Sequence, residues 1–164
     1  MARKLTQTEN SSTQSIDEKD IAILKLLQQN AKMTISDLAK SVHLSTTPVY
    51  DRIKRMEQNG IIKQYATLLD VQKINKSLIV ISYVSLKEHN KVAGSKFVKR
   101  ILELNDVTAC YSISGEYDFM LKVIASDMQA YYDFHVNVLS QVENIGHIQS
   151  VFVMGVIKDT HVVL

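Results

Sequence analysis

Two predicted helices separated by only four residues are the feature that most limits the fold of this chain. The first begins at Thr34, whose hydroxyl can accept a hydrogen bond from a backbone N–H of the first turn. The second begins at Ser45 and tolerates Pro48, because an N–H there has no partner within the helix. It ends near Gly60. Residues 41–44 are too few for an unconstrained loop, so the spacing predicts a helix-turn-helix.

The second of these helices has an apolar face and a polar face. Val49, Ile53 and Met56 recur at helical spacing and are expected to face the core. A helix that reads DNA carries short polar side chains near its N-terminus for base edges and cations around them for phosphates. The residues expected to contact double-stranded DNA are Ser45, Thr46, Thr47, Tyr50, Arg52, Lys54 and Arg55. An ordinary solvated face is the alternative, but the tight pairing of two capped helices favours DNA binding.

A further helix precedes this pair and begins by the same local rule. Asp17 is the predicted N-cap, Asp20 stands at the capping-box position, and the helix is expected to reach about Asn30. Agreement among three helix starts is typical of a small folding unit. We therefore predict a helix-turn-helix, winged-helix-like domain over residues 16–65.

The segments on either side of this domain have different compositions. Residues 1–15 are polar and predict a flexible tail. Residues 61–65 and 66–70 resemble short extended segments, which form either a small wing or, given their length, a connector. The domain boundary is placed in a connector over residues 66–77.

Charge and cysteine content narrow the class of protein. The formal net charge is +2, but residues 1–65 hold ten basic against seven acidic side chains, whereas residues 66–164 hold nine against ten. A positive bias on the helical half suits phosphate binding.

Cys110 is the only cysteine, so an internal disulfide is excluded and a reducing cytoplasm is expected. No apolar run approaches a membrane span, and no membrane partner is expected.

The second half alternates strand and helix patterns over residues 78–164. Strands are expected at 78–86, 107–114, 118–125, 147–157 and 160–164, with helices at 91–104 and 126–142. Ser126 and Gln129 are taken as the capping box of the later helix, and its inward residues as Met128, Tyr131, Phe134 and Val138. The βαββαβ order predicts an α+β, ferredoxin-like sandwich with both helices on one face of an antiparallel sheet.

The strands of this predicted sheet are apolar on both faces. Leu78 and Val80 point one way in the first strand, while Ile79, Ile81 and Tyr83 point the other. Helices cover one face, and the chain has no spare element for the second. We therefore expect a homodimer formed through the sheets, which would present two recognition helices to a pseudo-palindromic site.

The turn of residues 114–118 is a candidate ligand site. Gly115 permits a backbone conformation that other residues resist, and Tyr117 and Asp118 place a phenol and a carboxylate beside it. A plain hairpin turn is the alternative. A carboxylate beside free backbone groups can satisfy the ammonium and carboxylate groups of an amino acid.

These patterns together resemble the Lrp/AsnC family, the feast/famine transcriptional regulators of the leucine-responsive and asparagine-operon type. The resemblance covers about residues 16–164, and its most specific stretches are LSTTPVYDRIKRMEQNGII and SGEYDFMLKV. Their marker residues are Ser45, Pro48, Arg52, Gly60, Gly115, Tyr117 and Asp118. The resemblance implies a DNA-binding domain joined to a sensing domain that forms dimers, often octamers, and binds an amino-acid effector at a site including Gly115, Tyr117 and Asp118.

The chain departs from the family pattern at two positions. His43 and Asn75 stand where the family commonly has glycine, in the turn between the helices and in the linker. Histidine tolerates a positive φ better than most residues, but not freely.

Two other classes of function remain as alternatives. A DNA-binding architectural protein would share the fold and lack an effector. A small α+β enzyme would need an acid or base such as His135, His147 or the Tyr117–Asp118 pair. No triad spacing, phosphate loop or metal-ligand cluster occurs, so we expect no catalysis, no cofactor and no metal.

Overall fold

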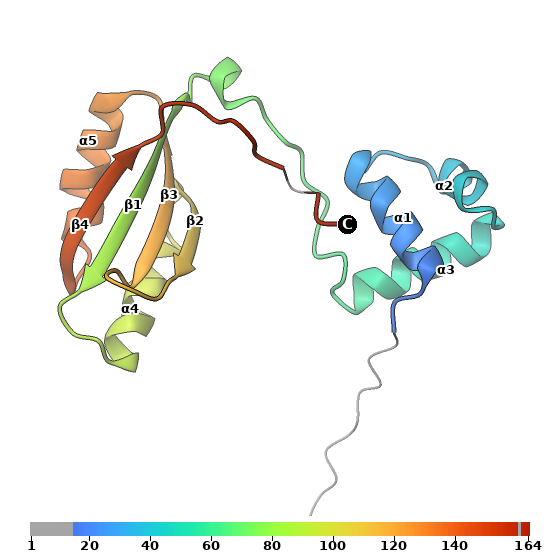
Figure 1. The fold of residues 1–164 in the computed structure, drawn as a ribbon, viewed down its shortest axis with the longest axis horizontal. Helices are drawn as coiled ribbons and strands as arrows, with labels where there is room; N and C mark the ends of the chain where they lie inside the picture. Colours follow the sequence, from blue (N-terminus) through green and yellow to red (C-terminus); the bar gives the residue numbers. More distant parts are fainter. Residues whose placement is uncertain (1–14, 161) are drawn as a thin grey trace, which may run out of the picture. The chain divides into compact units, whose positions relative to one another are not determined.

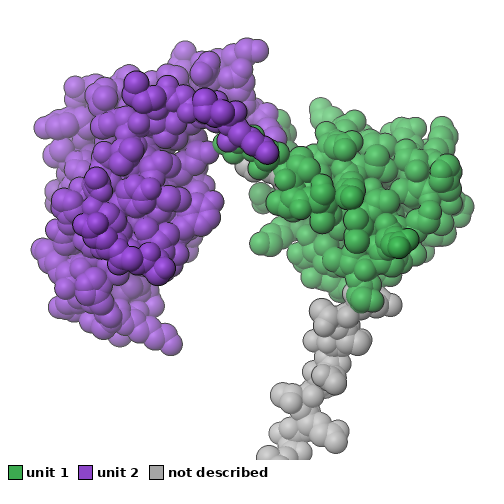
Figure 2. Space-filling view, in the orientation of Figure 1, with its two compact units in different colours: residues 1–67, 159–164 green, residues 68–158 purple. Residues whose placement is uncertain are grey.

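The computed structural model describes residues 15–160 and 162–164, and the predicted tail lies almost wholly outside them. These residues form two compact units (Figure 2). The first contains the described residues up to Thr67 together with Asp159–Leu164, and the second contains Leu68–Lys158.

The first unit is built from three helices, α1 (Glu18–Gln29), α2 (Ile35–Val42) and α3 (Thr46–Gln58) (Figure 1). The capping box of α1 is confirmed, because Asp17 accepts from the Asp20 N–H and the Asp20 carboxylate accepts from the Asp17 N–H. Thr34 caps α2 in the same way through the Asp37 N–H. The core lies where the three helices meet and consists of Ile23, Leu24, Leu38, Ala39, Val42, Val49, Ile53 and Met56.

His43 and Asn75, which stand where the family commonly has glycine, adopt the left-handed backbone conformation, and each ends a short helix. His43 ends α2 with φ 55°, and the next N–H, that of Leu44, donates to the Ala39 carbonyl. Asn75 ends a short 3-10 helix, η1 (Val71–Ile74), with φ 56°. Asparagine and histidine are among the non-glycine residues that adopt this conformation most readily. The turns therefore keep the geometry of a glycine cap without a glycine.

Residues 61–77, which lead from α3 to β1 and are called the connector from here on, contain no β-structure. Residues 61–70 are extended or bent without pairing, and η1 follows them. Residues 61–70 therefore do not form the small wing that was one of the two alternatives, and they have the extended conformation expected of a connector. Gly60, with φ 69°, ends α3 as predicted.

The second unit is the predicted ferredoxin-like α+β sandwich. Its sheet contains β1 (Leu78–Leu86), β2 (Val107–Ser112), β3 (Phe119–Ala125) and β4 (Ile145–Phe152), all antiparallel in the order β2-β3-β1-β4. Two helices, α4 (Lys91–Ile101) and α5 (Met128–Asn137), cover one face, and a 3-10 turn, η2 (Leu139–Gln141), follows α5 (Figure 1).

The core of this unit lies between the helices and the sheet. Alternate residues of β1 and β3 are buried, as the two-residue period of a strand requires. Phe97 of α4 stacks against Phe119 of β3 with ring centroids 4.5 Å apart. Tyr131 of α5 shares a hydrogen bond with the buried Ser82 hydroxyl at 3.0 Å, which ties the helix to β1.

Three predicted details of this unit are wrong. Asp127, not Ser126, caps α5, because its carboxylate accepts the Ala130 N–H. Met128 is exposed rather than buried, whereas Tyr131 and Phe134 do face the core. The two helices end earlier than expected, at Ile101 and Asn137.

The C-terminal residues form no strand within the described part of the chain. β4 ends at Phe152, so the expected strands at 147–157 and 160–164 are respectively shorter and absent. Residues 159–164 belong instead to the first unit, where the Val163 N–H donates to the Gln28 side-chain oxygen at 2.9 Å.

Candidate nucleic-acid interface and effector turn

The exposed face of α3 lies opposite its buried residues. Successive helical residues are rotated by about 100°, so Thr47 and Lys54 fall on the side away from Val49, Ile53 and Met56. Both side chains are exposed. The sequence prediction of a polar face on this helix is confirmed in its burial pattern.

Two further residues of α3 share this exposed face and were missed. Asp51 and Gln58 are exposed and lie at the same helical rotation as Thr47 and Lys54. A helical-wheel count from the buried residues would have found them. The sequence prediction considered only short polar and cationic side chains, so it missed the acid Asp51 and the amide Gln58. An amide such as Gln58 and a carboxylate such as Asp51 can each hydrogen-bond to a base edge.

The start of α3 is exposed and lacks a side-chain cap. Ser45 is the N-cap residue by backbone geometry, but its hydroxyl makes no capping hydrogen bond. Thr46 and Thr47 follow it and are exposed. The N-terminus of this helix thus presents backbone N–H groups and three hydroxyls on one surface, a combination suited to phosphate and base contacts.

Arg52 and Arg55 lie on a different side of α3, against α1. Their shared partner is the Asp20 carboxylate, which is 1% exposed. Arg52 Nη1 donates to Asp20 Oδ1 at 2.8 Å, and Arg55 Nη2 donates to Asp20 Oδ2 at 2.5 Å. Arg52 also donates to Asp17 at 2.6 Å. The hydrogen bonds that the guanidinium donates to the two carboxylates raise the Arg52 pKa, so Arg52 is charged and its charge is neutralised within the protein.

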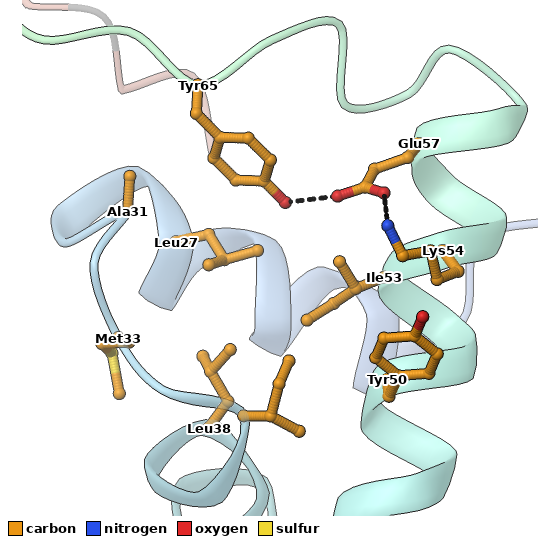
Figure 3. Close-up of a pocket in the computed structure, with 10 residues that line it drawn as sticks. Leu27, Ala31, Met33, Leu38, Tyr50, Ile53, Lys54, Glu57 and Tyr65 are labelled. Atoms are coloured by element: carbon orange, nitrogen blue, oxygen red, sulfur yellow. Dashed lines mark hydrogen bonds and ion pairs between the residues drawn. The ribbon is translucent and has the colours of Figure 1, made fainter.

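Tyr50, on a third side of α3, and Lys54, at the edge of the exposed face, line a pocket (Figure 3). The Lys54 ammonium lies 5.8 Å from the centre of the Tyr50 ring and 2.8 Å from a Glu57 oxygen. Tyr65 of the connector closes the rim of the pocket by donating its hydroxyl hydrogen to Glu57 at 3.0 Å. The remaining lining is apolar and consists of Leu27, Ala31, Met33, Ile35, Leu38 and Ile53.

Asp118 at the end of the turn between β2 and β3 is held by the strand β1. Its Oδ2 accepts the Leu86 N–H at 2.7 Å, and its Oδ1 lies 3.0 Å from His89 Nδ1. The backbone hydrogen bond from Leu86 lowers the pKa of this carboxyl below its usual value. Gly115 has φ 128°, a conformation that L side chains rarely adopt, so glycine is required there.

Tyr117 belongs to the same turn but bonds elsewhere. Its hydroxyl donates to Gln149 Oε1 at 2.6 Å, and its ring lies 5.4 Å from the Tyr83 ring. The His147 ring stacks with the Tyr117 ring, with the ring centroids 6.3 Å apart. Gly115, Tyr117 and Asp118 are thus joined in one turn, while the Tyr117 hydroxyl bonds to β4 and the Asp118 carboxylate bonds to β1. Gln149 was not among the predicted site residues, and His147 was named only as an acid or base for the enzyme alternative. Nothing local in the sequence signals their contacts with Tyr117.

The sheet face opposite the helices is largely apolar. Ile81 is paired with Lys122 and Val151 across the sheet, so these three residues share that face. Its other apolar members are Ile79, Tyr83, Ala109, Tyr111, Met120 and Ile124. No helix of the described residues covers this face, in agreement with the sequence expectation of a second apolar surface.

The described residues contain no group of three or more His, Cys, Asp and Glu side chains arranged to hold a metal ion. None of the described helices is long and apolar enough to cross a bilayer. His135 packs beside Tyr131, with ring centroids 6.0 Å apart.

Comparison with protein families agrees with both units. Residues 16–63 match the winged helix-turn-helix DNA-binding family, and residues 79–163 match the Lrp/AsnC ligand binding domain. The fold and these matches define a transcriptional regulator with a DNA-binding domain and a ligand-binding domain.

Individual relatives extend the match over nearly the whole chain. The DNA-binding transcriptional activator DecR of Escherichia coli is 32% identical over 145 residues, which cover 88% of this chain and 95% of DecR. The leucine-responsive regulatory protein of Haemophilus influenzae is 30% identical and covers 98% and 97% of the two chains. The chain belongs to the Lrp/AsnC family.

Solved structures resemble this chain over most of its length. A transcriptional regulator from Neisseria meningitidis, crystallised as an L-Met complex, has a TM-score of 0.84 and 33% identity, covering 90% of this chain and 95% of that one. An AsnC family regulator from Agrobacterium tumefaciens has a TM-score of 0.85 and 34% identity, covering 90% and 96%.

Proposed function

We propose that this regulator reads double-stranded DNA through the N-terminus and exposed face of α3. The observation that carries the proposal is the exposure of Thr47 on the side of α3 opposite the buried Val49, Ile53 and Met56. We assign base reading to Thr47, Asp51 and Gln58, because they lie on the side of α3 that the core leaves open. Ser45 and the backbone N–H groups beside it are assigned to phosphate.

The structure changes the part proposed for the two arginines. Arg52 and Arg55 are each engaged with Asp20, and a phosphate would have to compete with a buried carboxylate for them. We assign them to holding α3 in position against α1. Tyr50 and Lys54 keep a place at the edge of the reading surface, beside the pocket.

We propose further that an amino acid bound near residues 113–118 changes the assembly or the DNA affinity of the protein. The ligand-binding family match and the L-Met complex of the Neisseria meningitidis regulator support an amino-acid effector. Asp118 is fixed by Leu86 and is charged at neutral pH, so it can attract an ammonium group. Tyr117 and Gln149 supply a hydroxyl and an amide nearby.

The apolar sheet face is proposed as the surface of a two-fold homodimer. A second copy would cover Ile79, Ile81 and Tyr83, which no other described element covers. Substitution Ile81→Arg should give monomers in sedimentation experiments, whereas Lys122→Arg on the same face should leave the assembly unchanged. The same measurement on the wild type separates dimers from octamers.

Two binding experiments test the proposed function. Selection from a pool of random duplexes should recover an enriched sequence, and Thr47→Ala should relax the preference at one base pair by about 1–3 kcal/mol. Thr108→Ala in the second unit is the control. A thermal shift with each of the twenty amino acids should stabilise the wild type but not Asp118→Ala. Duplex binding without any amino-acid response would favour an architectural protein instead.

A further inference from the structure

Hydrogen bonds among Tyr65, Glu57 and Lys54 link the connector to the face of α3 that is proposed to read DNA. Tyr65 donates its hydroxyl hydrogen to Glu57 Oε1 at 3.0 Å, and the Lys54 ammonium donates to Glu57 Oε2 at 2.8 Å (Figure 3). Glu57 therefore uses one oxygen for the connector and the other for the helix. We name Tyr65, Glu57 and Lys54 the connector strap.

Glu57 is held more firmly than an ordinary surface carboxylate. Its side chain is 28% exposed, whereas that of Lys54 is 48% exposed. Hydrogen bonds from Lys54 and Tyr65 lower the Glu57 pKa, and the same carboxylate raises the Lys54 pKa. Burial, and then the hydrogen bond to Glu57, raise the Tyr65 pKa to about 12. At neutral pH, Tyr65 is therefore a neutral phenol, Glu57 a carboxylate and Lys54 an ammonium group.

The pairing has an electrostatic consequence at the DNA-binding surface. Lys54 lies on the same face of α3 as Thr47, but Glu57 neutralises its charge at 2.8 Å. A lysine bound to a carboxylate displaces fewer counterions from DNA than one that binds a phosphate directly. Lys54 can therefore exist in two states, tied to Glu57 or bound to a phosphate.

We propose that Glu57 is a positioning residue that couples Lys54 to the connector, so that release of Tyr65 frees the Lys54 ammonium for a DNA phosphate. Tyr65 lies two residues before Thr67, after which the chain passes into the ligand-binding unit. A movement of the connector removes one of the two hydrogen bonds that orient the Glu57 carboxylate. Glu57 then gains rotamer freedom and holds Lys54 less well. The proposal depends on the proposed DNA contact of α3.

The first test measures the salt dependence of binding to a random-sequence duplex of about three helical turns. Glu57→Gln removes the partner of Lys54, and the slope of log K against log salt should steepen by about 0.9, the value for one added phosphate contact. The double variant Lys54→Gln/Glu57→Gln should return to the wild-type slope. Glu143→Gln, which removes one exposed charge from the second unit, is the control and should leave the slope unchanged.

The second test asks whether Tyr65 acts through Glu57. Tyr65→Phe keeps the ring and removes the hydroxyl, so it should steepen the slope part of the way in the wild type. It should have no effect in the Glu57→Gln background. Tyr132→Phe, which removes an exposed hydroxyl from α5, is the matched control. An equal effect of Tyr65→Phe in both backgrounds, or none in the wild type, overturns the coupling.

A third measurement does not depend on DNA. The Lys54 ammonium, titrated by NMR in the free protein, should show a lower pKa in Glu57→Gln and an intermediate one in Tyr65→Phe. Failure of the wild type to bind any duplex would refute DNA binding by α3. Normal duplex binding with an unchanged Lys54 titration in both variants would refute the connector strap alone.

Discussion

The Asp20 carboxylate and the Arg55 guanidinium meet at 2.5 Å, although 35 positions separate them in the chain. Asp20 belongs to the first turn of α1, and Arg55 to the last turn of α3. The pair therefore fixes the crossing of α1 over α3. A change in that crossing would rotate the exposed face of α3, which is the surface proposed to read DNA.

Removal of Asp20 should destabilise the protein strongly. Asp20→Ala leaves two partly buried guanidinium groups without their common partner and should lower the free energy of unfolding by about 3 kcal/mol. Urea denaturation measures the loss. Glu18→Ala, which removes an acid from the same helical turn, is the control. A loss no larger than that of the control would show that the buried pair contributes little.

Arg55→Gln should affect stability without removing a phosphate contact. Asp20 loses one charged donor and keeps Arg52, so unfolding should occur at a lower urea concentration. The slope of log K against log salt for a random duplex, measured where the variant is folded, should stay that of the wild type. A slope shallower by about 0.9 would instead assign Arg55 to a phosphate.

Asp118→Ala should lower the stability of the second unit. The variant leaves the N–H of the buried Leu86 without its acceptor, and this costs about 1–3 kcal/mol. Because the folded-state pKa of Asp118 lies below the usual 3.8, its carboxylate contributes fully above that value. The stability difference between wild type and variant should therefore shrink as the pH falls through the folded-state pKa. Glu116→Ala in the same turn is the control, and a difference independent of acid pH would contradict the assignment.

The raised pKa of the Tyr65 phenol should make the folded protein less stable at alkaline pH. Its pKa is raised to about 12 in the folded state, from an ordinary value of 10.0, so the unfolded chain loses this proton first. The contribution of Tyr65 is present below pH 10 and falls as the pH rises from 10.0 to about 12. Denaturation over this interval should show a shallower decline for Tyr65→Phe than for Tyr132→Phe. Equal declines would mean that the phenol is not protected.

Local chemistry made much of the fold predictable from the sequence. Asp17 and Thr34 cap helices through bonds to residues three positions away, so the signal and the structure lie within one turn. Gly60 ends α3 through its own backbone conformation. The two-residue alternation of β1 likewise gave both its buried side, with Val80, and its open side, with Ile81.

Pairings between distant segments could not be predicted in the same way. Asp20 satisfies the local rule for a capping box, and nothing near it in sequence indicates that Arg52 and Arg55 are its main partners. Basic residues on a helix beside a polar face look the same whether they bind phosphate or a buried acid. At α5 the ambiguity was local, because Ser126 and Asp127 are adjacent and both can cap a helix; the carboxylate makes the bond.

The return of residues 159–164 to the first unit makes the ligand-binding unit an insertion in the order of the chain. The Val163 bond to Gln28 joins the C-terminal residues to α1 within the first unit. After a single proteolytic cut in the connector, the C-terminal segment alone would hold the two fragments together, as in split-protein complementation.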